Sequence, residues 1–293
     1  MKINTRPAHV SLVLLSMVGL QGCVSNLAAV RTFATDTQTL TSTISQTIDD
    51  EPKSCMRRLY RDRTIQTDQE DIILKGKKAC DDLQNAAKIP QSLNTVMTEY
   101  AKTLSALADN QFATYSGELN QIRGALTQVK DGDTLLFKST DIQASISISN
   151  LILQASTEAY RQREIKHLLE KHDDLVKVAN TLKQYLNRSY LIALRSERDS
   201  IESQLLTLEQ KWLKKESVRA RELIEDLKLS LETVEKKKQA AQTTVIAIDA
   251  MIASHEKLKA ALDHLDHSTL LQSMIEYGGI VSSLRNQLKT VSN

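Results

Sequence analysis

Few residues in this sequence could do chemistry, and the first of them is a pair on a predicted helix. Glu164 and His167 lie one helical turn apart, which is the Glu-x-x-His spacing of di-iron helical bundles. Such bundles need a second Glu-x-x-His motif and two further glutamates, and the sequence contains no second motif. We interpret the pair as part of a solvated helix face, so we predict no metal there.

Segment 263–267, Asp-His-Leu-Asp-His, also places two histidines on one side of a helix. Histidines beside carboxylates could form a surface ion site or give a mild pH response. A polar helix end explains the same residues without a ligand. We favour that interpretation and leave the ion site as the alternative.

A catalytic site needs a nucleophile or a metal, a base and a group that stabilises developing charge. The sequence contains no glycine-rich phosphate loop, no nucleophile elbow and no paired-histidine zinc motif. Its three cysteines are assigned to other roles below, which leaves no free thiol. We therefore predict no catalytic residues, no metal ligands and no cofactor, and we expect a protein that is not an enzyme.

The N-terminal stretch has the layout of a secretory signal. Lys2 and Arg6 precede an apolar run over Val10–Leu20, which is too short to span a bilayer. Small residues follow the run. The pattern predicts export of the chain from the cytoplasm.

The end of this run, Leu-Gln-Gly-Cys at 20–23, resembles the lipobox of bacterial lipoproteins. The resemblance implies that the thiol of Cys23 receives a diacylglycerol, that residues 1–22 are removed, and that the new amino group is acylated, as with palmitate. In lipoproteins an Asp after the cysteine implies retention at the inner membrane. Val24 stands there instead, so the resemblance implies the periplasmic face of the outer membrane. An ordinary secreted protein with a chance cysteine is the alternative.

The charge of the exported chain is balanced. Without Lys2 and Arg6, the 38 basic residues fall to 36, which equals the number of acidic residues. Nucleic-acid-binding proteins usually carry a basic excess. We therefore predict no nucleic-acid partner, and the membrane contact is expected through the lipid anchor.

Cys55 and Cys80 remain as an even pair in a compartment that is expected to be oxidising. This arrangement predicts a disulfide bond between them. Two separate buried thiols are the alternative.

The distribution of proline and glycine favours long helices. Neither residue occurs between Asp133 and Tyr277, a span in which a β-rich chain would need turn residues. Aromatic residues make up only 4% of the chain, and its aliphatic residues recur at helical spacing. We predict an all-α fold, an elongated bundle of long antiparallel, coiled-coil-like helices, in one domain over residues 23–293.

Four expectations concern the course of the chain. The first helix is expected to end before 49, with an irregular crossover near 49–79 held by the disulfide. A second helix is expected over 91–130, after Pro90. The Ile/Ser alternation of 141–153 fits either a strand or a helix, and we favour a helix.

The remaining breaks are weaker. Polar stretches suggest reversals at 187–189 and 264–268, a hinge at 238–242, and a break in the last helix at Gly278-Gly279. Trp212 lies on a leucine seam, where core packing is preferred over a role as an interface anchor.

These features favour a cell-envelope lipoprotein that binds or scaffolds a protein partner, because long helices offer grooves for helix docking. No small-molecule substrate is evident in the sequence. The alternative is a membrane-active, pore-former-like protein with an apolar head at 142–153.

Overall fold

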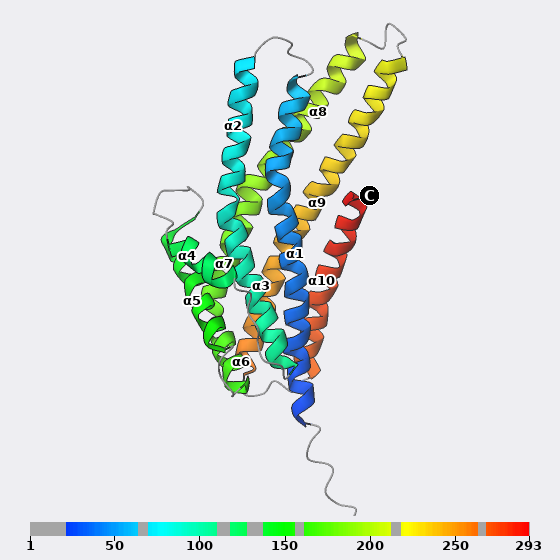
Figure 1. Ribbon diagram of the computed structural model, residues 1–293. Coiled ribbons are helices and arrows are strands. Elements are labelled where there is room, and N and C mark those ends of the chain that lie inside the picture. The colour runs from blue at the N-terminus through cyan, green and yellow to red at the C-terminus, as the bar shows by residue number, and fades with distance from the viewer. Residues whose placement is uncertain are drawn as a thin grey trace, which may run out of the picture.

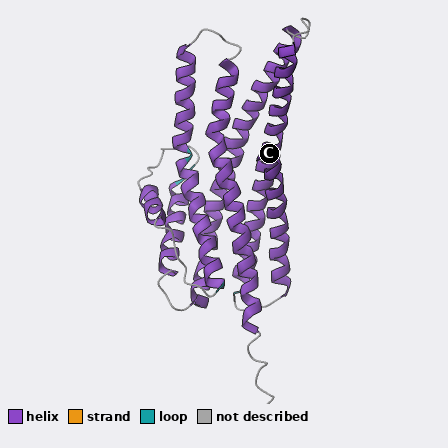
Figure 2. Cartoon of the chain, turned by 45° about the vertical axis from the view of Figure 1, so that its right-hand side comes forward, coloured by secondary structure: helices purple, strands orange, loops and turns teal. Residues whose placement is uncertain are grey.

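The computed structural model describes residues 22–63, 70–109, 118–127, 137–155, 161–211, 218–262 and 268–292. Within these ranges the chain is almost entirely helical and contains no strand (Figure 2), which confirms the all-α prediction. The coiled-coil-like packing of the helices stays a prediction. The helices are α1 (Gly22–Arg63), α2 (Glu70–Ala86), α3 (Lys88–Ala108), α4 (Glu118–Thr127), α5 (Ser139–Ala155), α6 (Arg161–Glu170), α7 (His172–Tyr185), a π-helical turn η1 (Leu186–Tyr190), α8 (Leu191–Lys211), α9 (Val218–Ala260) and α10 (Ser268–Ser292).

The long helices lie side by side along one axis (Figure 1). From its start at one end, α1 runs to the other, and α2 and α3 return beside it. The continuous run of α7, η1 and α8 rises again, α9 descends through the full length, and α10 rises part of the way. The half of the bundle near the start of α1 is therefore thick, with α4, α5 and α6 on one flank, whereas the other half consists of α1, α2, α8 and α9.

The central helix is α1, which contacts α2, α3, α8, α9 and α10. Its buried face repeats at steps of three and four residues: Val30, Ala34, Thr37, Thr41, Ile44 and Ile48. The threonines on this face are as buried as the aliphatic residues, because each hydroxyl bonds inside its own helix. Thr37 Oγ1 donates to the Phe33 carbonyl at 2.8 Å, and Thr41 Oγ1 to the Gln38 carbonyl at 3.0 Å.

The expected irregular crossover at 49–79 is wrong over 49–63 and 70–79, and residues 64–69 lie outside the described residues. Residues 49–63 belong to α1, which runs for 42 residues, and residues 70–79 belong to α2. Pro52 lies inside α1 and removes the amide that would bond to the Ile48 carbonyl. Helix continues past it because Glu51, Ser54 and Cys55 are buried against neighbouring helices, and this packing outweighs the local cost.

Other expected boundaries also differ. The helix expected at 91–130 is divided into α3 and α4, while 187–189 lies in η1 and joins α7 to α8 without a reversal. Residues 238–242 and Gly278-Gly279 lie inside continuous helices. At Gly278 a side chain would collide with Asp36 of α1, so the glycine lets α10 approach α1 closely. Residues 264–267 lie outside the described residues, and α9 and α10 pack against each other on either side of them.

The Ile/Ser stretch is helical, as favoured from the sequence, and forms most of α5. Ile142, Ile148 and Ile152 are buried in the core. Ser145 and Ser149 are also fully buried, and each donates to a backbone carbonyl four residues earlier. Because serine hydroxyls can be satisfied inside a helix, the alternating pattern is compatible with a helix whose two sides are both covered.

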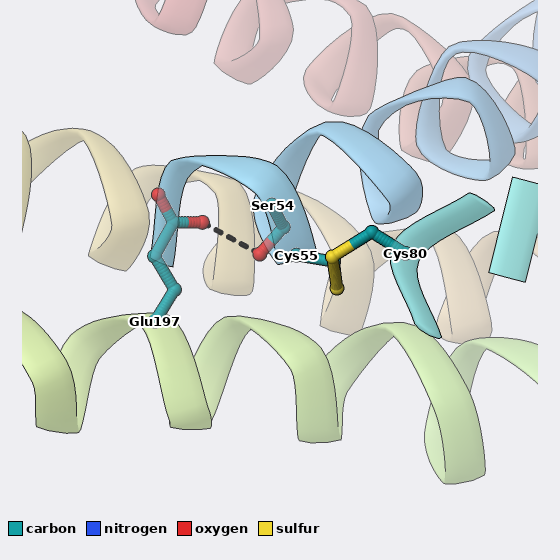
Figure 3. The surroundings of a disulfide bond; sticks show 4 residues. All are labelled: Ser54, Cys55, Cys80 and Glu197. Atoms are coloured by element: carbon teal, nitrogen blue, oxygen red, sulfur yellow. Dashed lines mark hydrogen bonds between the residues drawn. A yellow bond between two sulfur atoms is a disulfide. The ribbon is translucent and has the colours of Figure 1, made fainter. Parts of the chain in front are cut away.

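Cys55 and Cys80 form a disulfide bond that joins α1 to α2, as predicted (Figure 3). Among the α2 side chains whose burial is described, that of Cys80 is the only buried one. Gly76 permits the close approach of Leu59 from α1. The disulfide therefore provides much of the attachment of α2, since a closed loop of about 25 residues is credited with roughly 3 kcal/mol.

Loss of the disulfide is expected to release α2 while the rest of the bundle stays folded. In Cys80→Ser, hydrogen exchange of α2 amides should accelerate at least about tenfold, which corresponds to roughly 1.4 kcal/mol of lost local stability. Amides of α3, which buries a full face, serve as the internal control and should keep their protection. Unchanged exchange across α2 in this variant would contradict the assigned role of the bond.

Candidate functional site

A layer of paired charges crosses the bundle beside the disulfide. Arg57 of α1 binds Glu197 of α8 through two bonds, Nε to Oε1 at 2.7 Å and Nη2 to Oε2 at 2.9 Å. The same guanidinium donates to Asp50, about two turns earlier on the same face of α1, at 3.0 and 3.2 Å. Lys237 of α9 and the hydroxyl of Tyr190 also donate to Asp50, at 2.8 and 2.9 Å. We call these five residues the charged layer.

A second carboxylate lies next to this layer. Glu51 is buried and accepts hydrogen bonds from the hydroxyls of Tyr185 and Ser189. Ser189 belongs to η1, and Tyr185 immediately precedes that π-helical turn. The wider π-helical turn changes the direction in which side chains point along α7 and α8. It brings the hydroxyls of Tyr185 and Ser189 to the carboxylate of Glu51.

The environment of the charged layer shifts the pKa values of its groups. Burial raises the pKa of Asp50, but the hydrogen bonds and charges of Arg57 and Lys237 outweigh burial and hold the pKa below its usual range. Burial and the neighbouring carboxylates raise the pKa of Tyr190 well above that of a free tyrosine. Asp50 therefore stays ionised and Tyr190 stays protonated near neutral pH.

The charged layer is structural. Both oxygens of Asp50 accept hydrogen bonds, and both oxygens of Glu197 do so as well, the latter with Ser54 as an additional donor at 2.6 Å (Figure 3). A general base needs a lone pair directed at a substrate, and these oxygens have theirs directed at protein donors. The layer binds α1 to α8 and α9.

Two histidines form a second buried cluster near the other end of the bundle. His255 of α9 is fully buried, and its Nδ1 lies 2.9 Å from Nδ1 of His172. Its Nε2 contacts the hydroxyl of Tyr100, which donates to the Leu168 carbonyl at 3.0 Å. Because the single Tyr100 proton is used there, His255 donates from Nε2, and its Nδ1 accepts from His172.

Burial lowers the pKa of His255 to about 3, with the charges of His172 and Lys259 acting in the same direction. Burial also lowers the pKa of His172. Protonation of His255 would direct a second hydrogen at the proton of His172 Nδ1. The pair is therefore neutral and packed, with Phe33 edge-on to His255 at a ring-centroid distance of 5.6 Å.

The solvated face expected at Glu164 is wrong for that residue. Glu164 is fully buried, with Arg163 Nε at 3.3 Å and His167 Nδ1 at 3.7 Å from its Oε1. Hydrophobic neighbours on α6, such as Leu168, turn this side of the helix inward. The described residues contain no cluster of three or more His, Cys, Asp or Glu side chains that could hold a metal ion.

An open cleft lies along the disulfide, between α1 and the α2–α3 pair. Its volume is about 730 Å³. Ile48, Pro52, Met56 and Ala87 form its apolar part, and Cys80 of the disulfide lines it as well. We call this space the disulfide cleft.

Several residues singled out from the sequence cannot be judged by contacts. Cys23 lies in the first turn of α1, but its side chain is outside the described residues, as are Trp212 and 263–267. The lipidation of Cys23 stays a prediction.

Neither the charged layer nor the disulfide cleft was predicted from the sequence. The buried seam of the first helix passes through Ile44 and Ile48 and continues, at the same spacing, to Glu51 and Cys55. Both of these residues are buried. This continuation is the signal that the first helix does not end before Pro52.

The fold and this site define an all-α, disulfide-stapled helical bundle. Comparisons with protein-family models, with curated proteins and with solved structures give no match.

Removal of the Glu197 charge is expected to destabilise the bundle strongly. Glu197→Gln leaves the buried part of Arg57 without its bidentate partner and should lower the free energy of unfolding by about 2–4 kcal/mol. Glu202→Gln, on the same helix, breaks a surface pair with Arg198 and should cost less than about 1 kcal/mol. Urea denaturation of both variants provides the measurement, and equal costs would contradict a structural charged layer.

The histidine pair predicts a pH-dependent contribution to stability. The folded pKa of His255, about 3, lies below the unfolded value near 6.5, so its contribution is complete above pH 6.5 and is lost as the pH falls toward 3. The contribution of Asp36 to stability has the opposite pH dependence, because burial raises the pKa of its carboxyl group to about 6. Comparison of the wild type with His255→Gln isolates the contribution of His255 to the pH dependence of the free energy of unfolding.

The stability difference between wild type and His255→Gln should shrink by up to about 1.4 kcal/mol per pH unit below pH 6. Denaturation midpoints at a series of pH values provide the measurement. A difference that is constant from pH 7 to pH 4.5 would show that His255 titrates normally in the folded protein.

Proposed function

We propose that this chain is a non-enzymatic cell-envelope lipoprotein, anchored through Cys23 at the periplasmic face of the outer membrane, that binds or scaffolds a protein partner. The first observation that supports this proposal is the position of α1. This helix starts at Gly22, beside the proposed lipid attachment, and continues for about 63 Å through the bundle. A tether at that end places the end of α1, the start of α2, the end of α8 and the start of α9 farthest from the membrane (Figure 1).

The observation that carries the proposal is the position of the exposed apolar side chains. Among the described residues, six of the nine large exposed ones lie in the last turns of α1 and α8 or in the first turns of α2 and α9: Tyr60, Leu74, Leu206, Val218, Leu223 and Leu229. Their exposed fractions range from 44 to 68%. Exposed apolar surface gathered on one part of a protein favours interaction with a partner. We call these six side chains the distal apolar surface.

The membrane-active alternative has less support. Its proposed head forms α5, whose isoleucines are packed in the core, so insertion would require α5 to leave the bundle. Among the described helices, none is both long and apolar enough to cross a bilayer. Release of dye from liposomes by the purified protein would favour this alternative.

Photo-crosslinking in intact cells tests the partner proposal. A benzophenone amino acid at Leu206, which is 59% exposed on the distal apolar surface, is expected to give a discrete protein adduct. The same probe at Ile275, which is 52% exposed on α10, is the matched control and is expected to give none. In Cys23→Ala the chain should lose its lipid and partition away from detergent, and the Leu206 adduct should decrease because the tether is lost.

Equal adducts at both positions, or none at Leu206, would contradict a specific distal surface. Unchanged detergent partitioning of Cys23→Ala would contradict the lipid anchor by itself. The two parts of the proposal are thus tested separately.

A further inference from the structure

The disulfide cleft has the size and lining of a ligand site, and it shares only Arg57 with the charged layer and Tyr60 with the distal apolar surface. Its volume of about 730 Å³ falls within the range of roughly 300–1,000 Å³ that is common for small-ligand pockets. The floor contains the aliphatic and thioether groups of Ile48, Pro52 and Met56, which α1 presents at a spacing of four residues. Ile48 is buried, whereas Pro52 and Met56 are half-buried and accessible from the cleft.

Four charged side chains surround this floor, two of each sign. Asp49 and Lys53 come from α1, Asp81 comes from α2, and Lys88 comes from the start of α3. All four are exposed, and none forms an ion pair with another residue of the described ranges. Arg57 also lines the cleft, but Asp50 and Glu197 already neutralise it. The cleft therefore offers both a cationic and an anionic partner to a ligand.

Gln91 lines the cleft but offers it no accessible hydrogen-bond acceptor. Gln91 donates from Nε2 to Ser45 at 2.6 Å, which fixes the orientation of its amide. Its Oε1 is buried and has no hydrogen-bond partner in the described part of the protein. An oxygen without accessible surface cannot accept a hydrogen bond from a ligand in the cleft, so recognition there rests on the apolar floor and the charged walls.

From the apolar floor and the charged walls we propose that the disulfide cleft binds a short peptide in which one acidic and one basic group flank an apolar side chain. The apolar side chain packs on Met56 and Pro52, and the charges pair with the walls. A zwitterionic phospholipid shares the charges but has two acyl chains to bury, and a floor of a few apolar side chains offers them little surface. The peptide site does not depend on the lipid anchor or on the distal apolar surface.

Methionine-methyl NMR of the full chain tests the site, because Met56 lines the cleft while Met97 and Met251 are buried in the core. The probes are blocked tripeptides, Lys-Leu-Glu against Lys-Leu-Lys and Glu-Leu-Glu. Lys-Leu-Glu should shift the Met56 methyl signal saturably and bind at least about tenfold more tightly than the other two. The Met97 and Met251 signals should stay in place, which also shows that each variant is folded.

Two adjacent exposed residues of α2 provide a matched pair of variants. Asp81 lines the cleft and Asp82 does not. Asp81→Lys should weaken Lys-Leu-Glu binding about fivefold or more, and Asp82→Lys should leave it unchanged, although both variants change the net charge equally.

Three results would overturn the proposal. The first is an unshifted Met56 signal at up to about 10 mM Lys-Leu-Glu, where even an interaction of under 3 kcal/mol would be visible. The second is an equal response to all three peptides. The third is a response of Met56 to dihexanoyl phosphatidylethanolamine at lower concentration than to the peptide, which would assign the cleft to a lipid.

Discussion

Arg57 is held between Asp50 of its own helix and Glu197 of α8, and the arrangement of the long helices depends on this contact. Aliphatic seams repeat every three or four residues, so two long helices can pack in several registers at similar free energy. A buried charge is satisfied in one register only, since a slip of a single turn would leave it unpaired in a low-dielectric interior. Lys237 adds the same condition for α9 through its bond to Asp50. The charged layer therefore fixes how far α1, α8 and α9 are shifted along one another.

On α1, two adjacent residues secure opposite neighbours. Ser54 bonds to Glu197 of α8, and Cys55 is joined to Cys80 of α2 (Figure 3). The two attachments differ in kind because the surfaces differ: α8 packs against several helices, whereas α2 contributes little buried surface of its own. A covalent bond holds a helix that packing would hold weakly, and it leaves the disulfide cleft open beside it.

In the thick half of the bundle, a small number of aromatic rings packs together in the core. Phe33, Tyr100, His255 and Tyr277 come from four helices and meet in one layer. Each polar atom in this layer has a partner, as in the bond between Thr37 and the Tyr277 hydroxyl at 3.2 Å. The chain thus fills this layer with few aromatic residues.

By itself the sequence determined the fold class, the helical state of 141–153 and the pairing of Cys55 with Cys80, because these follow from local periodicity, from the scarcity of proline and glycine and from cysteine count. Tertiary structure decided that the helical chain continues through Pro52, through η1 and through Gly278, where the sequence predicts breaks. In each case packing against another helix outweighs a local preference: burial of Glu51 and Cys55 carries α1 past its proline, and contact with Asp36 retains a glycine inside α10. The charged layer could not be predicted, since Asp50, Glu197 and Lys237 are distant in sequence and look like solvated residues until the bundle brings them together. The same is true of Glu164, which the sequence placed at the surface and the packing of α6 placed in the interior.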